Sequence, residues 1–259
     1  MRSSKISKLI LLYSFALVFV IASRAMAGNI NSKRENIFEN INLEAKAVYI
    51  YDLSTNEEIW SKNPEAQLPL ASLTKLMTVY VARKEGVADT DLACFTLTTS
   101  SNKYAQILAD YLPNTLENMN LEANNLRLHQ TYYLNPTGLD ISLNLAGAYG
   151  SATDQAELMS ALYRSFPELM SCTTKTEVTW NGLTYKNTNP DIDRTEGILG
   201  SKTGLTDLAG GNLAIIFDIE IDHPVIMIIL GSSEAGRFSD AEVLQRAIRL
   251  YMSNNEQLP

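Results

Sequence analysis

Residues 72–81 read Ser72-Leu73-Thr74-Lys75-Leu76-Met77-Thr78-Val79-Tyr80-Val81. Their apolar side chains recur at helical spacing and Gly86 ends the pattern, which predicts a helix that begins at Ser72. Ser72 and Lys75 are three positions apart, so the hydroxyl and the amine share one helix face. A serine is a weak nucleophile until a base takes its proton, and a lysine is such a base only if burial or a nearby cation lowers its pKa. Alone, this pair is a weak signal, because the same spacing occurs by chance on many solvated helices.

Strands are predicted at both ends of the chain, with helices between them. The strands are expected over 45–51, 59–62, 177–180, 183–185, 212–221 and 225–230, with Asn181-Gly182 as a hairpin turn. The further helices are expected over 102–112, 115–128, 152–166 and 240–252, and Ser151 with Asp154 begins the third of these as a capping box would. This order indicates an α+β fold with a mainly antiparallel sheet flanked by helices.

Composition excludes several classes of protein. The chain has 259 residues, of which 46% are apolar and 19% charged, so it is globular with material for a large core. Its 29 acidic and 21 basic residues give a net charge of −8, and the basic residues form no stripe, so nucleic acid is not expected as a partner. With only His129, His223 and two cysteines as further metal-binding or triad-forming residues, no metal or cofactor is expected.

Residues 1–27 predict a secretory signal peptide. Basic residues precede a largely apolar run over 9–22, and Ala25-Met26-Ala27 follows as a small-residue cleavage site. The run is shorter than the roughly 20 residues of a membrane-spanning helix. We expect cleavage after Ala27 and an exported domain over 28–259, in the periplasm or at the cell surface, with membrane association only if the segment is retained.

Cys94 and Cys172 lie far apart in the sequence. Export would permit a disulfide between them, but the sequence does not say whether their Cβ atoms meet. A disulfide and two separate buried thiols are therefore equal alternatives at this stage.

Two further clusters carry chemical groups. Ser100-Ser101-Asn102 begins the next helical pattern, where by itself it indicates an N-cap. Lys202-Thr203-Gly204 places an ammonium, a hydroxyl and an unobstructed backbone where an anionic group could bind.

In this order, Ser-x-x-Lys at 72–75, Ser-x-Asn at 100–102 and Lys-Thr-Gly at 202–204 resemble the signature shared by penicillin-binding proteins and serine β-lactamases. The flanking sequence is similar to the D-alanyl-D-alanine carboxypeptidases, the low-molecular-mass penicillin-binding proteins of peptidase family S11. The matching segments are 69–78, 135–139, 151–154, 187–189 and 202–206. The resemblance runs from about Ala45 to the C-terminus and implies a penicillin-binding protein or serine β-lactamase-like fold.

The resemblance also implies roles for individual residues. Ser72 would attack the carbonyl between the two terminal D-alanines of a peptidoglycan stem peptide, and β-lactams would acylate it as inhibitors. Lys75 would take the serine proton, Lys202 would hold Lys75 neutral by repulsion, and Ser100 would relay the proton to the leaving amine.

The remaining roles concern substrate binding. The resemblance implies that Asn102 hydrogen-bonds the substrate amide, and that Thr203, with Lys202 and Arg237, recognises its terminal carboxylate. Backbone N–H groups of Ser72 and Leu205 would stabilise the oxyanion. Gly204 belongs to the same binding strand.

One departure from the family keeps other functions open. The interval from Ser72 to Ser100 is shorter than the family's usual one, which predicts a trimmed helical subdomain in which 92–99 leads into Ser100. A catalytically impaired homologue that binds peptidoglycan is therefore one alternative. A serine β-lactamase is another, with Glu117 and Glu122 as the nearest candidates for the glutamate that activates the deacylating water.

Overall fold

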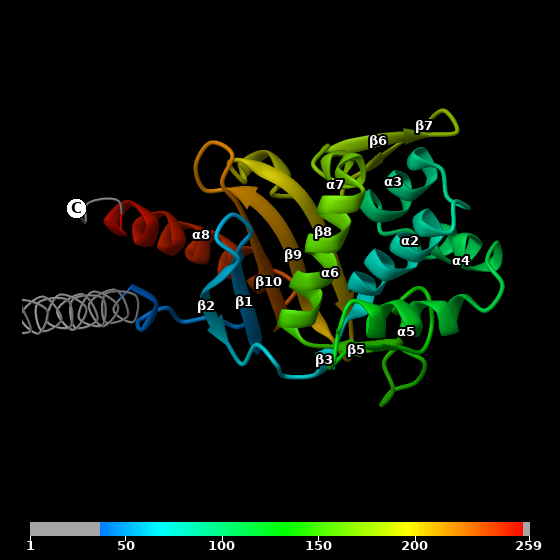
Figure 1. Cartoon of the computed structure of the whole chain (residues 1–259), viewed down its shortest axis with the longest axis horizontal. Coiled ribbons are helices and arrows are strands. Elements are labelled where there is room, and N and C mark those ends of the chain that lie inside the picture. Colours follow the sequence, from blue (N-terminus) through cyan, green and yellow to red (C-terminus); the bar gives the residue numbers. More distant parts are fainter. Residues whose placement is uncertain (1–36, 256–259) are drawn as a thin grey trace, which may run out of the picture. The chain divides into compact units, whose positions relative to one another are not determined.

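The computed structural model describes residues 37–255 (Figure 1), and the predicted signal peptide over 1–27 lies outside them. The chain divides into two compact units, which are considered separately. One is Leu43–Gln245, and the other combines the residues up to Asn42 with those from Arg246 onward. In the second unit, the rings of Phe38 and Tyr251 lie 6.3 Å apart.

A five-stranded sheet forms the centre of the larger unit. Its order is β2 (Glu57–Lys62), β1 (Ala47–Asp52), β10 (Pro224–Ser232), β9 (Gly210–Asp218) and β8 (Ile198–Thr206). Every neighbouring pair is antiparallel, as the sequence predicted. The apolar residues of β9 and β10 are almost all buried, which explains why these strands read as continuous apolar runs. β8 lies at the end of the order, so one edge of it is open to other groups.

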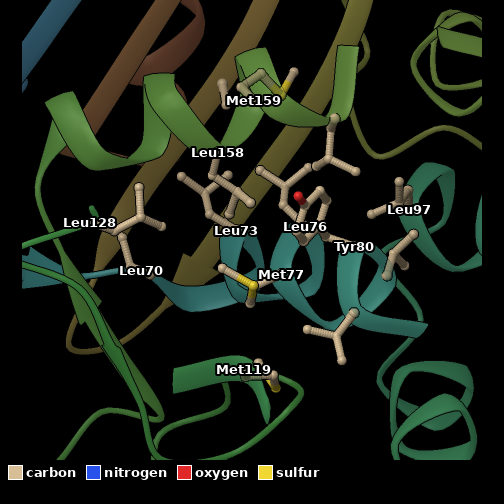
Figure 2. Close-up of a cluster of buried hydrophobic side chains, with 14 of the residues drawn as sticks. Leu70, Leu73, Leu76, Met77, Tyr80, Leu97, Met119, Leu128, Leu158 and Met159 are labelled. Atoms are coloured by element: carbon tan, nitrogen blue, oxygen red, sulfur yellow. The ribbon is translucent and has the colours of Figure 1, made fainter. Parts of the chain in front are cut away.

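Helices cover the sheet and build a second layer beside it (Figure 1). Their bounds are α2 (Thr74–Lys84), α3 (Thr90–Thr98), α4 (Asn102–Asp110), α5 (Thr115–Asn125), α6 (Ala152–Ser165), α7 (Pro167–Cys172) and α8 (Gly236–Asn255). Figure 2 shows Leu158 of α6 next to the side chains of Leu73 and Leu76. α2 is buried from Thr74 to Ala82 and is thus a core helix, surrounded by the others.

Most predicted elements are confirmed, with shifted ends. Ser151 caps α6, because its Oγ accepts the N–H of Asp154 at 3.1 Å. The predicted helix start at Ser72 was wrong: a 3₁₀ turn, η1 (Ala71–Leu73), precedes α2. α8 begins at Gly236, earlier than expected.

Three short strands and one hairpin complete the unit. β3 (Leu68–Pro69), β5 (Ala148–Gly150) and β4 (Tyr132–Tyr133) form a small antiparallel sheet, and η2 (Ile192–Arg194) precedes β8. β6 (Glu177–Trp180) and β7 (Leu183–Lys186) form the predicted hairpin. Its two turn residues, Asn181 and Gly182, both have positive φ, as a type I′ turn requires.

The two cysteines form a disulfide. Cys94 of α3 and Cys172 of α7 are bonded, with their Cα atoms 5.9 Å apart, so the first of the two alternatives is correct. Among residues 37–255, no helix is both long and apolar enough to cross a membrane.

Candidate active site

Ser72 lies in η1, the turn that connects β3 to α2. Lys75 is fully buried in the first turn of α2, and its Nζ donates to Ser72 Oγ at 2.8 Å and to the carbonyl of Thr137 at 2.6 Å. Burial lowers the pKa of Lys75 to about 7, because the charged amine loses its hydration. The pair therefore has the geometry and the basicity that proton transfer from a serine requires.

The loop 135–138 supplies the second partner of Lys75. Asn135 Oδ1 accepts the N–H of Gly138 at 2.7 Å and the hydroxyl of Thr137 at 3.0 Å, which folds the loop tightly. Gly138 has a φ of +77°, and a Cβ on it would lie 1.8 Å from the carbonyl oxygen of Ala71. Only glycine fits this contact, so the loop packs directly against η1, the turn that carries Ser72 and is called the nucleophile turn below.

Lys202 reaches the site from β8. Its buried Nζ donates to Ser100 Oγ at 2.8 Å and to the carbonyl of Thr203 at 2.7 Å. Burial, followed by the charges of Lys75 and Arg237, holds the pKa of Lys202 well below its usual range. Because repulsion between two charges is mutual, the expected effect of Lys202 on Lys75 stays a prediction, and burial is the cause that the structure gives at Lys75.

The open edge of β8 packs against the nucleophile turn. A Cβ on Gly204 would lie 3.0 Å from the carbonyl oxygen of Leu70 and 3.3 Å from the Cβ of Ala71, so a larger residue would push the strand away. Leu205, the next residue, has a half-exposed side chain. Its backbone N–H is the expected second donor to an oxyanion.

Thr203 and Arg237 both belong to the surroundings of the Lys-Thr-Gly segment, Thr203 as part of β8 and Arg237 through Gly204. Thr203 Oγ1 is 2.7 Å from the hydroxyl of Thr188, a residue in a matched segment to which the sequence assigned no role. Arg237 is buried and its Nη1 donates to the Gly204 carbonyl. Arg237 therefore lies beside the Lys-Thr-Gly strand, and its role in carboxylate recognition stays a prediction.

Ser100 and Asn102 form the opposite wall. Ser100 follows α3 in a left-handed conformation with φ +54°, and Ser101 is the N-cap of α4, accepting the N–H of Tyr104. Because Ser101 caps the helix, the Ser100 hydroxyl is left for Lys202. Asn102 is the first residue of α4 and is exposed.

Asn212 was missed in the sequence. It is fully buried in β9, and its Nδ2 donates to the carbonyls of Pro69 and Leu70 at 3.0 Å each, while its Oδ1 accepts the N–H of Gly231. It thereby ties the nucleophile turn to the sheet. An amide at the start of the apolar run 213–217 was the available signal, because buried amides are almost always hydrogen-bonded.

The chain is similar to known proteins. Residues 82–234, more than half of the chain, match the peptidase S11 family, D-alanyl-D-alanine carboxypeptidase. This range includes Ser100, Asn102 and the Lys-Thr-Gly segment, and it begins after Ser72 and Lys75.

Curated relatives match over a longer stretch. The chain is 29% identical to the D-alanyl-D-alanine carboxypeptidase DacD of Escherichia coli over 248 residues, 79% of this chain and 63% of DacD. It is 27% identical to the D-alanyl-D-alanine endopeptidase of E. coli, over 76% of this chain and 74% of that protein. The chain thus spans less than two thirds of the length of DacD.

Solved structures share the fold. Penicillin-binding protein D2 of Listeria monocytogenes, in its cefotaxime-bound form, superposes with a TM-score of 0.74 at 27% identity, covering 80% of this chain and 98% of that one. Penicillin-binding protein 6B of E. coli gives 0.71 at 28% identity, covering 80% of this chain and 78% of that one. The expected α+β penicillin-binding protein fold is confirmed, and the chain belongs to the peptidase S11 family of D-alanyl-D-alanine carboxypeptidases and related low-molecular-mass penicillin-binding proteins.

Proposed function

We propose that the protein is a serine-type D-Ala-D-Ala carboxypeptidase that removes the terminal D-alanine from peptidoglycan stem peptides through an acyl-enzyme on Ser72. The observation that carries this proposal is the pair of lysine–serine hydrogen bonds, Lys75–Ser72 and Lys202–Ser100, each 2.8 Å long and each with a buried lysine. A buried lysine of lowered pKa can be neutral near neutral pH and so act as a base.

Acylation begins at Ser72. Neutral Lys75 takes the hydroxyl proton as Ser72 Oγ attacks the carbonyl between the two D-alanines. The oxyanion that forms accepts hydrogen bonds from the backbone N–H groups of Ser72 and Leu205. Ser100, in contact with Lys202, relays this proton from Lys75 to the leaving amine, so that the C–N bond breaks, D-alanine departs and Lys75 is neutral again. Water then hydrolyses the ester and restores Ser72.

Substrate binding is assigned to the two walls of the site. Thr203 and Lys202 on β8, with Arg237 of α8 beside them, present a hydroxyl, an amine and a guanidinium for the terminal carboxylate, which is what a carboxypeptidase must recognise. Asn102, which is exposed at the start of α4, would hydrogen-bond the substrate amide. The substrate would be met in the periplasm or at the cell surface after export.

β-Lactams are the expected covalent inhibitors. The Listeria relative was crystallised in cefotaxime-bound and ampicillin-bound forms, which supports penicillin binding here. For a β-lactamase, the sequence offered Glu117 and Glu122. Glu122 is paired with Lys84 at 2.7 Å and Glu117 is exposed on α5, so neither favours that alternative.

The test uses residues 28–259, fluorescent penicillin and a stem-peptide mimic ending in D-Ala-D-Ala. We expect a covalent band and release of D-alanine, and we expect both to be lost in Ser72→Ala. His129→Ala is the control, because His129 is exposed and should leave labelling unchanged.

Each other outcome has a distinct meaning. A folded protein that takes up no penicillin would contradict an acylating enzyme and favour a peptidoglycan-binding homologue. Fast penicillin hydrolysis without D-alanine release would favour a β-lactamase. Loss of labelling in folded His129→Ala would overturn the serine–lysine assignment.

A further inference from the structure

The two residues proposed to deliver the proton to the leaving amine come from different parts of the chain. Ser100 follows α3, whereas Lys202 lies on β8, 102 positions later, and their atoms meet at 2.8 Å. Ser100 is only half-buried, so close packing alone does not enclose it. Whatever holds α3 relative to β8 therefore sets this distance.

A path that contains one covalent cross-link connects the two. Cys94 is in α3, the helix that leads to Ser100, and it is bonded to Cys172 at the end of α7. The next residue, Thr173, is buried, and its Oγ1 accepts the N–H of Ser201 at 2.9 Å. Ser201 is the neighbour of Lys202. The disulfide is thus the strong link in a path from one wall of the site to the other.

α7 packs closely against β8, so this part of the path is rigid. A Cβ on Gly200 would lie 3.3 Å from the Cβ of Met170, so helix and strand are in close contact. Met170 is fully buried. A force applied to α3 through the disulfide is therefore transmitted to the strand that carries Lys202.

The hydrogen bonds that run beside the disulfide are long. Thr98 Oγ1 donates to the carbonyl of Cys172 at 3.5 Å, and the N–H of Thr188 donates to the carbonyl of Thr98 at 3.2 Å. On its other side, α3 contacts the β6–β7 hairpin, where Phe95 packs on Trp180 with ring centroids 5.2 Å apart. That contact ties α3 to the hairpin. The link from α3 to β8 runs through Thr188, whose hydroxyl lies 2.7 Å from Thr203 Oγ1, and through the disulfide, which is the covalent one of the two.

We propose that the Cys94–Cys172 disulfide is a positioning cross-link that holds Ser100 within hydrogen-bonding distance of Lys202. This inference rests on the proposed acyl-transfer function. Its consequence is specific to one step, because the Ser100–Lys202 contact serves proton delivery to the leaving group, whereas Ser72 and Lys75 do not depend on it. A misplacement of about 1 Å can lower a rate about a hundredfold.

The test compares two reagents that react at Ser72. Acylation by penicillin requires protonation of the departing β-lactam nitrogen. A boronic acid adds to the serine oxygen without any leaving group. In Cys94→Ser/Cys172→Ser we expect the penicillin acylation rate to fall at least about tenfold, while boronic acid affinity stays within about twofold, at a temperature where the protein is folded.

Asp89→Ala is the matched control. Asp89 caps the far end of α3 by accepting the N–H of Leu92 at 2.7 Å, so its loss weakens the helix but leaves the cross-link intact. Its acylation rate should stay within about twofold of the wild-type rate.

A second variant cuts the same path elsewhere. Thr173→Val keeps the shape of the side chain and the disulfide but removes the acceptor of the Ser201 N–H, and it should lower acylation by a smaller factor in the same selective way. If the double cysteine variant does not fold, Thr173→Val tests the inference in its place.

Three results would overturn the inference. The first is an unchanged rate of penicillin acylation in the folded double cysteine variant, or in Thr173→Val if only that variant folds. The second is an equal loss of penicillin acylation and boronic acid affinity, and the third is an equal fall in the acylation rate of Asp89→Ala. A wild-type protein that no penicillin acylates would overturn the proposed function itself, and this is seen before any variant is compared.

Discussion

The two sides of the candidate site are held in different ways. On the nucleophile side, Lys75 is fully buried and the turn that carries Ser72 is pressed against Gly138 and Gly204, so backbone atoms leave no room for movement. On the wall side, Ser100 is half-buried and Asn102 is exposed, and their helices are tied to the rest by a disulfide and side-chain contacts. One side of the site is thus held by close packing and the other by a cross-link and side-chain contacts. Substitutions on the two sides should therefore have different effects on stability and activity.

The largest effect is expected from Lys75→Met on the nucleophile side. Methionine is an apolar chain of similar length and should fill the buried space, so the fold should survive while penicillin acylation is abolished for want of a base. Labelling with fluorescent penicillin and thermal unfolding measure the two quantities. Retained acylation would mean that another group takes the Ser72 proton.

Gly138→Ala tests the packing of the nucleophile side. The new Cβ would collide with the Ala71 carbonyl, so we expect destabilisation of more than about 2 kcal/mol and a fall in acylation of about a hundredfold. Gly182→Ala is the matched control, because Gly182 has a φ of +76° but open space around its Cβ. It should cost about 1 kcal/mol of backbone strain and leave acylation intact. Equal effects in both variants would show that φ, and not the contact, matters at Gly138.

The pH dependence of acylation tests the burial of Lys75. The neutral amine is the active form, and burial lowers the pKa of Lys75 to about 7, so the rate should rise with pH, reach half its maximum near pH 7 and level off above it. Below that pH the rate should fall about tenfold per unit. A rate that still rises near pH 10 would mean that Lys75 has an ordinary pKa and that its burial does not govern the step.

The smallest effect is expected on the wall side, from Asn102→Ala. Because Asn102 is exposed, stability should change by less than about 0.5 kcal/mol. Loss of one substrate hydrogen bond, worth about 1 kcal/mol, should raise KM for D-alanine release about fivefold. The pH midpoint of acylation should not move. A large loss of stability would contradict the contrast between the two sides.

Local patterns predicted much of the fold. Helical spacing predicted α2, α4, α5 and α6, and strand composition predicted the antiparallel sheet, because these depend on neighbours a few positions apart. The start of α2 was misplaced, since a 3₁₀ turn and a helix share the same spacing signal over one turn. The early start of α8 was missed because Gly236 and Ser239 in its first turn are weak helix formers.

Long-range contacts could not be predicted in the same way. The carbonyl of Thr137 as a partner of Lys75 comes from a loop 62 positions away, and a backbone acceptor has no side-chain signature. The hydrogen bonds from Asn212 to the nucleophile turn join residues that are more than 140 positions apart. The disulfide was one of two equal alternatives until the positions of α3 and α7 were known.

The sequence by itself determined the family resemblance, the set of reactive side chains and the order in which they occur, because residue types and short spacings are written in the chain. The tertiary structure decided which groups meet, that burial lowers the pKa of Lys75, and that Ser101 caps α4 while Ser100 faces Lys202. The physical reason is that proton transfer depends on desolvation and on distances of about 3 Å, and both arise only when segments far apart in the chain pack together.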